Sequence, residues 1–358
     1  MLVVAVLITW ITVSLQTDER SSHTSPSFHS KIALAVDIVW FYTIKAFLPL
    51  GICSDYGRPA IVSDTALVTV GKGLVVAAFL SISGFFGRRA GVAGAICYLL
   101  LLLPVSGLVS GVYGGVSSVA DRHMFLPLLG LSLMVAAALG PHWRRHELLV
   151  TCVAAVVLFA ISRYELAFWK DDETHFRRAI ELNPSSWNAY AFLGQHAMNV
   201  GDWKTAERRF RTALSLAPDW GVVRSQLGLA LLNQNRFQDS VEAFSLAREV
   251  DPNNRGVVRQ LAWMLASAAD ARHRSPHTAF RLMTQTSSVG VPLIPEDFDV
   301  LSVVYAAVGR FDEAVELGQQ AHRLYLSTGD LDKTKAVENR LRLFRNHQAF
   351  FDESPIAP

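Results

Sequence analysis

Long apolar runs alternate with short polar segments in the first half of the chain. No charged residue occurs over residues 90–120, a run of 31 positions, and about 20 apolar residues are enough for a helix to cross the hydrocarbon core. We therefore expect a transmembrane helix there. Similar runs predict further spans and bring the total over residues 1–165 to about six: 2–15, 32–52, 66–86, 124–138 and 148–161.

Basic residues in short loops predict how these spans are oriented. The arginine pairs at 88–89 and 144–145 lie two spans apart and therefore on one side, which the positive-inside bias assigns to the cytoplasm. Everything after Tyr164 is then expected on the external or periplasmic side of an inner membrane, and Met1 starts outside. Residues 2–15 lack a positively charged leading region. They are interpreted either as a sign that the natural beginning is missing or as a cleaved signal sequence.

The second half of the chain is periodic. Pro184, Pro218 and Pro252 are each 34 residues apart, which is the period of tetratricopeptide repeats. Small and large residues recur at the signature positions between them: Tyr190, Leu193, Gly194, Ala197, Ala206, Phe210 and Ala213, then Leu227, Gly228, Leu231, Ser240, Phe244 and Ala247. Small residues let paired helices approach closely, and large ones fill the contact between repeats.

The predicted fold class is all-α, with polytopic transmembrane helices over residues 1–165 followed by a tetratricopeptide-repeat α-solenoid over 166–350. Turn-forming residues interrupt the period over 270–298, and the pattern resumes at Leu301. A charged segment at 330–344 predicts a capping helix. We expect residues 351–358 to be a disordered tail.

The composition differs between the two halves of the chain. Hydrophobic residues make up 51% and charged residues 18%. Residues 1–165 carry only 11 Lys/Arg and 8 Asp/Glu out of 33 and 31 in the whole chain. A net charge of +2 without a long basic block argues against a nucleic-acid partner. The three cysteines lie in or beside apolar runs, without CxxC pairs or histidines at ligand spacing, so neither a disulfide framework nor a metal site is expected.

The repeats predict a protein or peptide partner. Helix pairs in such solenoids form a concave surface lined by the first helix of each pair, where peptides dock. The residues expected on that surface are Asn188, Gln195, Ser225, Arg259 and Trp263. The alternative is ordinary exposed surface for the four polar residues and packing against the next helix for Trp263.

Charges beside the apolar runs suggest a lipid ligand. Asp121 and Arg122 stand at the external end of a span, and Lys45 lies inside another. Charges inside a bilayer are costly, and guanidinium groups match phosphate oxygens with paired donors. Our hypothesis is that Arg122, with Asp121 and Lys45, binds a lipid phosphate. In the alternative, Asp121 pairs with Arg122 or with a helix end, and Lys45 extends to water.

Three segments together resemble one family. Residues 42–49 read Tyr-x-x-Lys-x-x-x-Pro, residues 119–130 contain Asp121-Arg122-His123-Met124-Phe125-Leu126-Pro127, and residues 168–176 form a tryptophan-anchored entry into the repeats. This combination resembles the transmembrane and tetratricopeptide-repeat-containing protein O-mannosyltransferases, with His123 where tyrosine is usual. Residues 261–266 and 309–314 resemble bacterial members of that family.

The resemblance implies a membrane fold that uses a polyprenyl-phosphate sugar and glycosylates external proteins. The family's catalytic acidic residues are expected in the first external loop of a longer membrane module, of which this chain resembles the closing half. Asp55 and Asp64 follow the segment at 32–52, but neither belongs to a matching acidic pair. We therefore assign no catalytic residue and expect no cofactor.

Three functional hypotheses follow. The leading one is an integral membrane repeat protein that binds proteins or peptides outside the cell membrane and is a non-catalytic or truncated relative of the membrane O-glycosyltransferases. The alternative is an active glycosyltransferase whose catalytic half is encoded upstream or supplied by a partner. The third is an inner-membrane assembly scaffold without a connection to glycosylation.

Overall fold

The computed structural model describes residues 28–53, 55–56, 65–106, 124–139, 145–287, 292–352 and 356–357. The chain divides into two compact units, Met1–Ala189 and Tyr190–Pro358, and each is described by itself. The described residues are helical apart from turns, loops and one isolated β-bridge, so the all-α class is confirmed. The span predicted at 2–15 lies outside the described residues, and so do Asp121 and Arg122.

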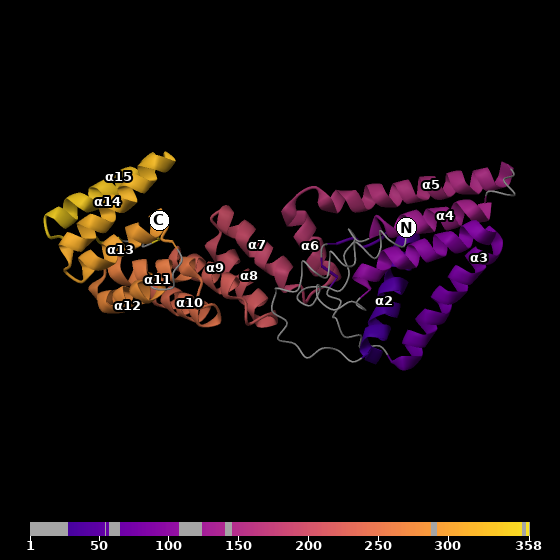
Figure 1. The fold of residues 1–358 in the computed structure, drawn as a ribbon, viewed down its shortest axis with the longest axis horizontal. Helices are drawn as coiled ribbons and strands as arrows, with labels where there is room; N and C mark the ends of the chain where they lie inside the picture. The colour runs from indigo at the N-terminus through magenta and orange to yellow at the C-terminus, as the bar shows by residue number, and fades with distance from the viewer. Residues whose placement is uncertain are drawn as a thin grey trace. The chain divides into compact units, whose positions relative to one another are not determined.

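Four long helices form most of the N-terminal unit: α2 (Phe28–Phe47), α3 (Ala66–Leu102), α4 (Pro127–Leu139) and α5 (Arg145–Leu166). Short 3₁₀ turns follow α3 (η1, Leu103–Val105) and α5 (η4, Ala167–Trp169), and α6 (Asp172–Leu182) comes next. Figure 1 shows that α3 changes direction along its length, so that it has two arms. The first arm lies within the span predicted at 66–86, and the second ends at Leu102, within the run 90–120; both apolar stretches are shorter than a membrane-spanning helix.

Two glycines allow the second arm of α3 to cross α4 at close range. A Cβ atom at Gly94 would lie 2.8 Å from the carbonyl oxygen of Gly130 and 2.7 Å from Cγ of Met134. A Cβ atom at Gly130 would collide with the backbone of Tyr98. Small residues at such crossings let helix backbones approach, which is a common way to pack helices in membranes.

Polar side chains inside the N-terminal unit are paired with each other. Lys72 Nζ on α3 donates to Asp37 Oδ1 on α2 at 2.7 Å, and Asp37 is buried. The hydroxyl oxygens of Thr43 and Tyr98 lie 3.0 Å apart, within hydrogen-bonding distance. The ion pair with Lys72 explains how α2 includes the carboxylate of Asp37 within an apolar sequence.

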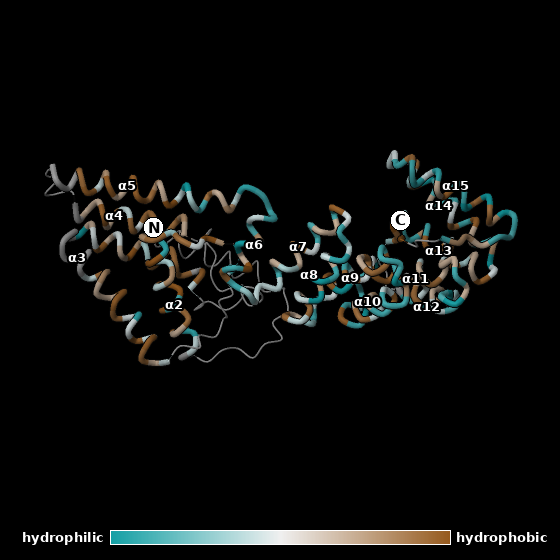
Figure 2. The backbone as a smooth tube through the Cα atoms, turned by 180° about the vertical axis from the view of Figure 1, so that it is seen from behind, coloured by the Kyte–Doolittle hydropathy of each residue, from teal (hydrophilic) through white to brown (hydrophobic). Residues whose placement is uncertain are grey.

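Apolar side chains cover the outside of the N-terminal helices. Within the part of the chain that the structure describes, Leu149–Trp169 is the one helical stretch long and apolar enough to cross a membrane by length and composition. Shorter apolar stretches occur in the two arms of α3, at Ala66–Ser81 and Arg89–Leu102, and in α4. Figure 2 shows hydrophobic residues along most of α3, α4 and α5, whereas hydrophilic and hydrophobic residues are mixed in α10–α15.

The C-terminal unit is built of helix pairs. The first helices of the pairs are α7 (Trp187–Asn199), α9 (Gly221–Leu232), α11 (Arg255–Ser267) and α13 (Pro295–Ala307). The second helices are α8 (Trp203–Leu216), α10 (Phe237–Val250), α12 (Pro276–Ser287) and α14 (Phe311–Thr328), and α15 (Leu331–Arg345) closes the array (Figure 1). The capping helix predicted at 330–344 corresponds to α15, with Asp330 as its N-cap.

The signature residues make the contacts that a tetratricopeptide repeat requires. A Cβ atom at Gly194 would lie 2.6 Å from the ring of Phe210, and one at Gly228 would lie 2.7 Å from the ring of Phe244. At each glycine, an aromatic ring of the second helix of a pair therefore packs against the backbone of the first helix. The tetratricopeptide architecture predicted from the 34-residue period is thus reproduced by the packing of this unit.

The interruption predicted over 270–298 contains a complete helix. Residues 271–273 form a 3₁₀ turn (η5, Ala271–His273), and α12 then begins at Pro276, as α13 begins at Pro295. Proline is well tolerated at the first helical position because its missing N–H would have no partner there. The prolines therefore start the helices of the third and fourth pairs, and the repeat continues through this region with a longer connection.

The chain returns to the array after α15. His347 adopts φ 56°, and the segment that follows pairs with α11 through Asp352. Within the tail predicted to be disordered at 351–358, the backbone of Asp352 is held by hydrogen bonds to Ser267 and Ala269, and residues 353–355 and 358 lie outside the described residues.

Candidate functional site

Lys45, a predicted lipid-phosphate ligand, is bound to the loop that follows its own helix. Its Nζ donates to the carbonyl oxygens of Leu50 and Gly51, the latter at 3.0 Å. It also lies 5.1 Å from the ring centroid of Tyr56. In this structure Lys45 thus closes the C-terminal end of α2, where a positive charge is favourable. Asp121 and Arg122, its predicted partners, lie outside the described residues.

The same loop is fixed from its other side by two buried carboxylates. Glu165 accepts hydrogen bonds from the backbone N–H groups of Gly51 at 2.8 Å and Ile52 at 3.0 Å. Asp55 accepts a hydrogen bond of 2.5 Å from Ser186 Oγ. Both carboxylates are only 2% exposed. Asp55, which the sequence offered as an acidic residue of an external loop, therefore joins this loop to the residues just before α7.

The polar residues predicted for the groove lie on the first helices of the array. Asn188 and Gln195 are half-buried on α7, and Ser225 is half-buried on α9. Gln195 Nε2 donates to Asn199 Oδ1, and Ser225 Oγ donates to the carbonyl oxygen of Val222. These bonds are local to each helix.

The two groove residues predicted on α11 make contacts within the array. Arg259 Nη1 lies 3.1 Å from Asp297 Oδ1, and Arg255 also pairs with Asp297. Trp263 is 2% exposed and packs near Phe350, with ring centroids 5.7 Å apart. Of the two roles that the sequence left open for Trp263, the structure shows packing.

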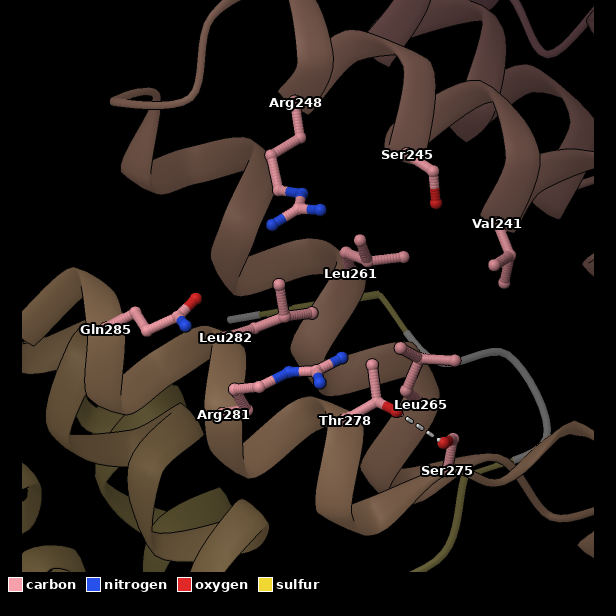
Figure 3. A pocket seen from close by; sticks show the side chains of 10 residues that line it. All are labelled: Val241, Ser245, Arg248, Leu261, Leu265, Ser275, Thr278, Arg281, Leu282 and Gln285. Carbon is pink, nitrogen blue, oxygen red and sulfur yellow. Dashed lines mark hydrogen bonds between the residues drawn. The ribbon is translucent and has the colours of Figure 1, made fainter.

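A cavity of about 510 Å³ lies among α10, α11 and α12. The apolar part of its lining, here called the floor, is formed by Leu261 and Leu265 of α11 together with Val241 and Leu282. The polar part, here called the rim, is formed by Ser245, Arg248, Ser275, Thr278, Arg281 and Gln285. Figure 3 shows the side chains of Arg248 and Arg281 extending into this space from opposite sides.

The two arginines of the cavity are available for a ligand. Arg248 Nε is buried without a hydrogen-bond partner among the described residues. The described part of the chain also places no carboxylate in the lining. Ser275 Oγ donates to Thr278 Oγ1 at 2.8 Å, which keeps these hydroxyls at the edge of the cavity. The arrangement suits an anionic group at the rim and an apolar side chain on the floor.

A second hollow of about 500 Å³ runs along α8, and the one carboxylate in its lining is already paired. Glu207 in its lining binds Arg211 at 3.0 Å and Arg236 at 2.7 Å. Burial alone would raise the pKa of Glu207, but hydrogen bonds from Gln234, Arg236 and Arg211 outweigh it and lower that pKa. All the residues that line this hollow are polar or charged, so it has no apolar floor like that of the cavity beside α12.

Sequence reasoning did not identify Arg248 and Arg281 as site residues. Arg281 lies on α12, inside the segment whose prolines indicated an interruption, so no helix phase was available to place it. The usable signal was the position of Pro276 and Pro295 at the starts of apolar-periodic stretches.

The comparisons with known proteins give likenesses to repeat proteins. No family model matches the sequence, and no curated protein matches it. Among solved structures, MamA is similar at 15% identity with a TM-score of 0.39, over 48% of this chain and 96% of MamA. A thermophilic TPR protein of Thermus thermophilus is similar at 21% identity with a TM-score of 0.37, over 53% of this chain and 95% of that protein.

A third solved structure, YrrB, is described as a TPR protein with an unusual peptide-binding site. It is 21% identical with a TM-score of 0.36, over 49% of this chain and 89% of YrrB. The tetratricopeptide assignment of the present array rests on its own phased glycines and helix pairs.

Proposed function

We propose that this protein is an integral membrane protein whose tetratricopeptide array binds a protein segment containing acidic and apolar residues. The observation that carries the proposal is the cavity among α10, α11 and α12, where Arg248 and Arg281 extend over an apolar floor (Figure 3). A segment with a leucine-like side chain and a neighbouring carboxylate would satisfy both parts of this lining.

The surface of α5 supports insertion into a membrane. Val150, Val156 and Phe159 are 67%, 67% and 68% exposed, and they point to different sides of the helix. Exposing apolar surface to water costs about 25 cal/mol of free energy per Å². Lipid tails would cover this helix on every side and remove that cost. Tyr164 and Trp169 follow at one end, where aromatic residues favour the membrane interface.

The multi-pass arrangement extends this argument to the other N-terminal helices. The arms of α3 also carry exposed apolar side chains, such as Leu67 and Leu74, and the ion pair between Asp37 and Lys72 lets α2 lie in an apolar environment. With the arginine pairs at 88–89 and 144–145 in the cytoplasm, the array lies on the external or periplasmic side of the inner membrane.

Binding is tested with the full chain in nanodiscs. The probe is a fluorescein-labelled peptide in which leucine and glutamate alternate, and the reference peptide has glutamine in place of glutamate. Loss of a charge-assisted hydrogen bond is worth about 1.5–3 kcal/mol, so Arg281→Glu and Arg248→Gln should each weaken binding of the acidic probe at least about tenfold. Arg323→Glu on α14 is the control for general charge, because Arg323 is exposed and lies outside the cavity. Equal weakening by all three variants, or equal binding of both peptides, would exclude the site.

The membrane arrangement is tested with single cysteines in a chain whose natural cysteines are replaced by serine. Val157→Cys on α5 should resist a water-soluble maleimide in intact membranes, because lipid surrounds this position in the proposal. Ser215→Cys on α8 should react with a membrane-impermeant maleimide added to spheroplasts. Labelling of Val157→Cys at the rate of Ser215→Cys would contradict the span, and protection of Ser215→Cys until lysis would reverse the orientation.

The proposal does not extend to sugar transfer. The resemblance to the O-mannosyltransferases implied a polyprenyl-phosphate sugar as partner, but Lys45 and Asp55 are engaged with the chain itself. An active glycosyltransferase completed by another polypeptide therefore stays an alternative based on sequence.

A further inference from the structure

The segment after α15 pairs with the chain at the C-terminal end of α11 through Asp352. Asp352 N donates to the carbonyl oxygen of Ser267 at 2.7 Å, and Ala269 N donates to the carbonyl oxygen of Asp352 at 3.0 Å. Five residues later, Ala357 N donates to Gln260 Oε1 at 2.8 Å. Asp352 therefore contacts the C-terminal end of α11, and Ala357 contacts a side chain in its N-terminal half.

Adjacent aromatic residues of the tail contact two different parts of the array. Phe350 packs near Trp263, and the guanidinium of Arg340 lies 5.4 Å from its ring centroid. The guanidinium of Arg274 lies 4.1 Å from the ring centroid of Phe351. Successive side chains of an extended chain point in opposite directions, so one ring lies against the core and the other against a surface arginine.

The contact leaves two buried donors without partners. Trp263 Nε1 and Arg340 Nε have no hydrogen-bond partner among the described residues, although Trp263 is 2% and Arg340 7% exposed. An unsatisfied buried donor costs about 1–3 kcal/mol. The tail thus packs against the apolar groups of this site and leaves the two donors without acceptors. A ligand with a suitably placed acceptor would satisfy them.

Trp263, Gln260 and Ser267 belong to a first helix of the array, and first helices line the concave surface of such solenoids. We propose that this side of α11 is a binding site for an extended protein segment with two adjacent aromatic residues, and that the chain's own residues 350–352 occupy it in competition with such a partner. The backbone groups of Ser267 and Ala269 recognise the extended main chain, and Trp263, Arg340 and Arg274 recognise the aromatic pair. This site is separate from the cavity beside α12, and its test is independent of that proposal.

The competition has an expected size. A tethered segment has an effective concentration on the order of millimolar. A free peptide must displace it, so the intact chain should bind the peptide at least about tenfold more weakly than a chain whose tail has lost its aromatic residues.

The test uses the full chain in nanodiscs and a fluorescein-labelled peptide with the sequence of residues 347–358. Phe350→Ala combined with Phe351→Ala empties the aromatic positions while keeping the tail, and this variant should bind the peptide at least about tenfold more tightly than the natural chain. Adding Arg274→Ala should reverse that gain. Adding Arg272→Ala should not, because Arg272 is 86% exposed and pairs with Asp270.

Three results would overturn the inference. The first is equal peptide binding by the natural chain and the double variant. The second is equal effects of Arg274→Ala and Arg272→Ala. The third is a double variant that loses its helical circular dichroism and its cooperative melting and shows no saturable peptide binding. The tail would then only stabilise the fold by covering α11. Light scattering tests whether two copies exchange their tails. A dimer of the natural chain that forms as the concentration rises would show that the tail contact is intermolecular, which would also contradict the inference.

Discussion

Arg340 and Asp299 form a buried ion pair that joins α15 to α13, in which one guanidinium nitrogen contacts both carboxylate oxygens. Arg340 Nη2 lies 2.8 Å from Oδ1 and 2.6 Å from Oδ2 of Asp299, and the carboxylate side chain has no exposed surface. Burial raises the pKa of Asp299, while the charge and hydrogen bonds of Arg340 oppose that rise. The closing helix of the array is thus attached through a carboxylate that depends on one arginine.

Removing that arginine should destabilise the array strongly. Arg340→Met leaves the buried carboxylate unpaired, at an expected cost of about 3–5 kcal/mol in the free energy of unfolding. Combining it with Asp299→Leu should recover most of the loss, because an apolar pair of similar volume avoids the desolvation cost. Urea unfolding followed by circular dichroism measures this. Arg342→Met is the control, since Arg342 is 67% exposed and pairs only locally with Glu338; a similar loss there would contradict the prediction.

Glu165 should control access to Cys53. Glu165 holds the backbone of Gly51 and Ile52, and Cys53 beside them is 1% exposed. Glu165→Ala removes two hydrogen bonds to a charged acceptor, so the loop should open more often. In a chain with Cys97 and Cys152 replaced by serine, the rate of maleimide labelling should rise at least about tenfold.

The control for this loop is Glu181→Ala. The side chain of Glu181 is 64% exposed and pairs with Arg178 on its own helix. If both alanine variants label at the natural rate, Glu165 does not hold the loop.

The two glycines Gly94 and Gly71 should respond oppositely to alanine. Gly94→Ala places a methyl group against Gly130 and Met134 and should cost about 1–3 kcal/mol by overpacking. Gly71 has nothing within 4 Å of its Cβ position, so Gly71→Ala should keep or raise stability because alanine is the better helix former. Thermal melting in detergent compares them, and equal midpoints would disprove the close crossing.

His175 should make the junction between α5 and α6 sensitive to acid. Burial lowers the pKa of His175 from its ordinary 6.5, and the charge of Asp172 opposes this. The folded state therefore favours the neutral ring, which lies 4.1 Å from the ring of Trp169. The stabilisation is complete above the unfolded pKa of about 6.5 and is lost as the pH falls toward the folded pKa.

The measurement is the melting temperature as a function of pH. The natural chain should lose more stability than His175→Phe as the pH falls below about 6.5. His277→Phe, at an exposed position of α12, should behave like the natural chain. Parallel curves for the natural chain and His175→Phe would show that this ring does not titrate in the expected range.

The repeat fold was predictable because its determinants are local in sequence. Gly194 and Phe210 lie within one 34-residue period, so their contact follows from the period itself. Asp330 is followed by a charged amphipathic stretch, and it caps α15 as such residues do. The same reasoning failed at Pro276, where a helix-starting proline was interpreted as a turn former.

The sites depended on contacts that periodicity does not encode. Arg248 and Arg281 face one cavity only because α12 follows a longer connection. Trp263 is covered by a residue 87 positions later, Phe350, after the chain reverses at His347. Position along a helix could place Trp263 on the correct side of α11, but it could not reveal what lies against it.

The pair between Asp37 and Lys72 has a consequence for biogenesis. An ionised aspartate or lysine at the centre of a single helix opposes insertion by about 2.5–3.5 kcal/mol. These two charges neutralise each other when α2 and the first arm of α3 lie side by side. In the proposed membrane arrangement the two segments should therefore enter the bilayer together as a hairpin, and a ribosome-bound chain ending before Lys72 should leave α2 poorly inserted.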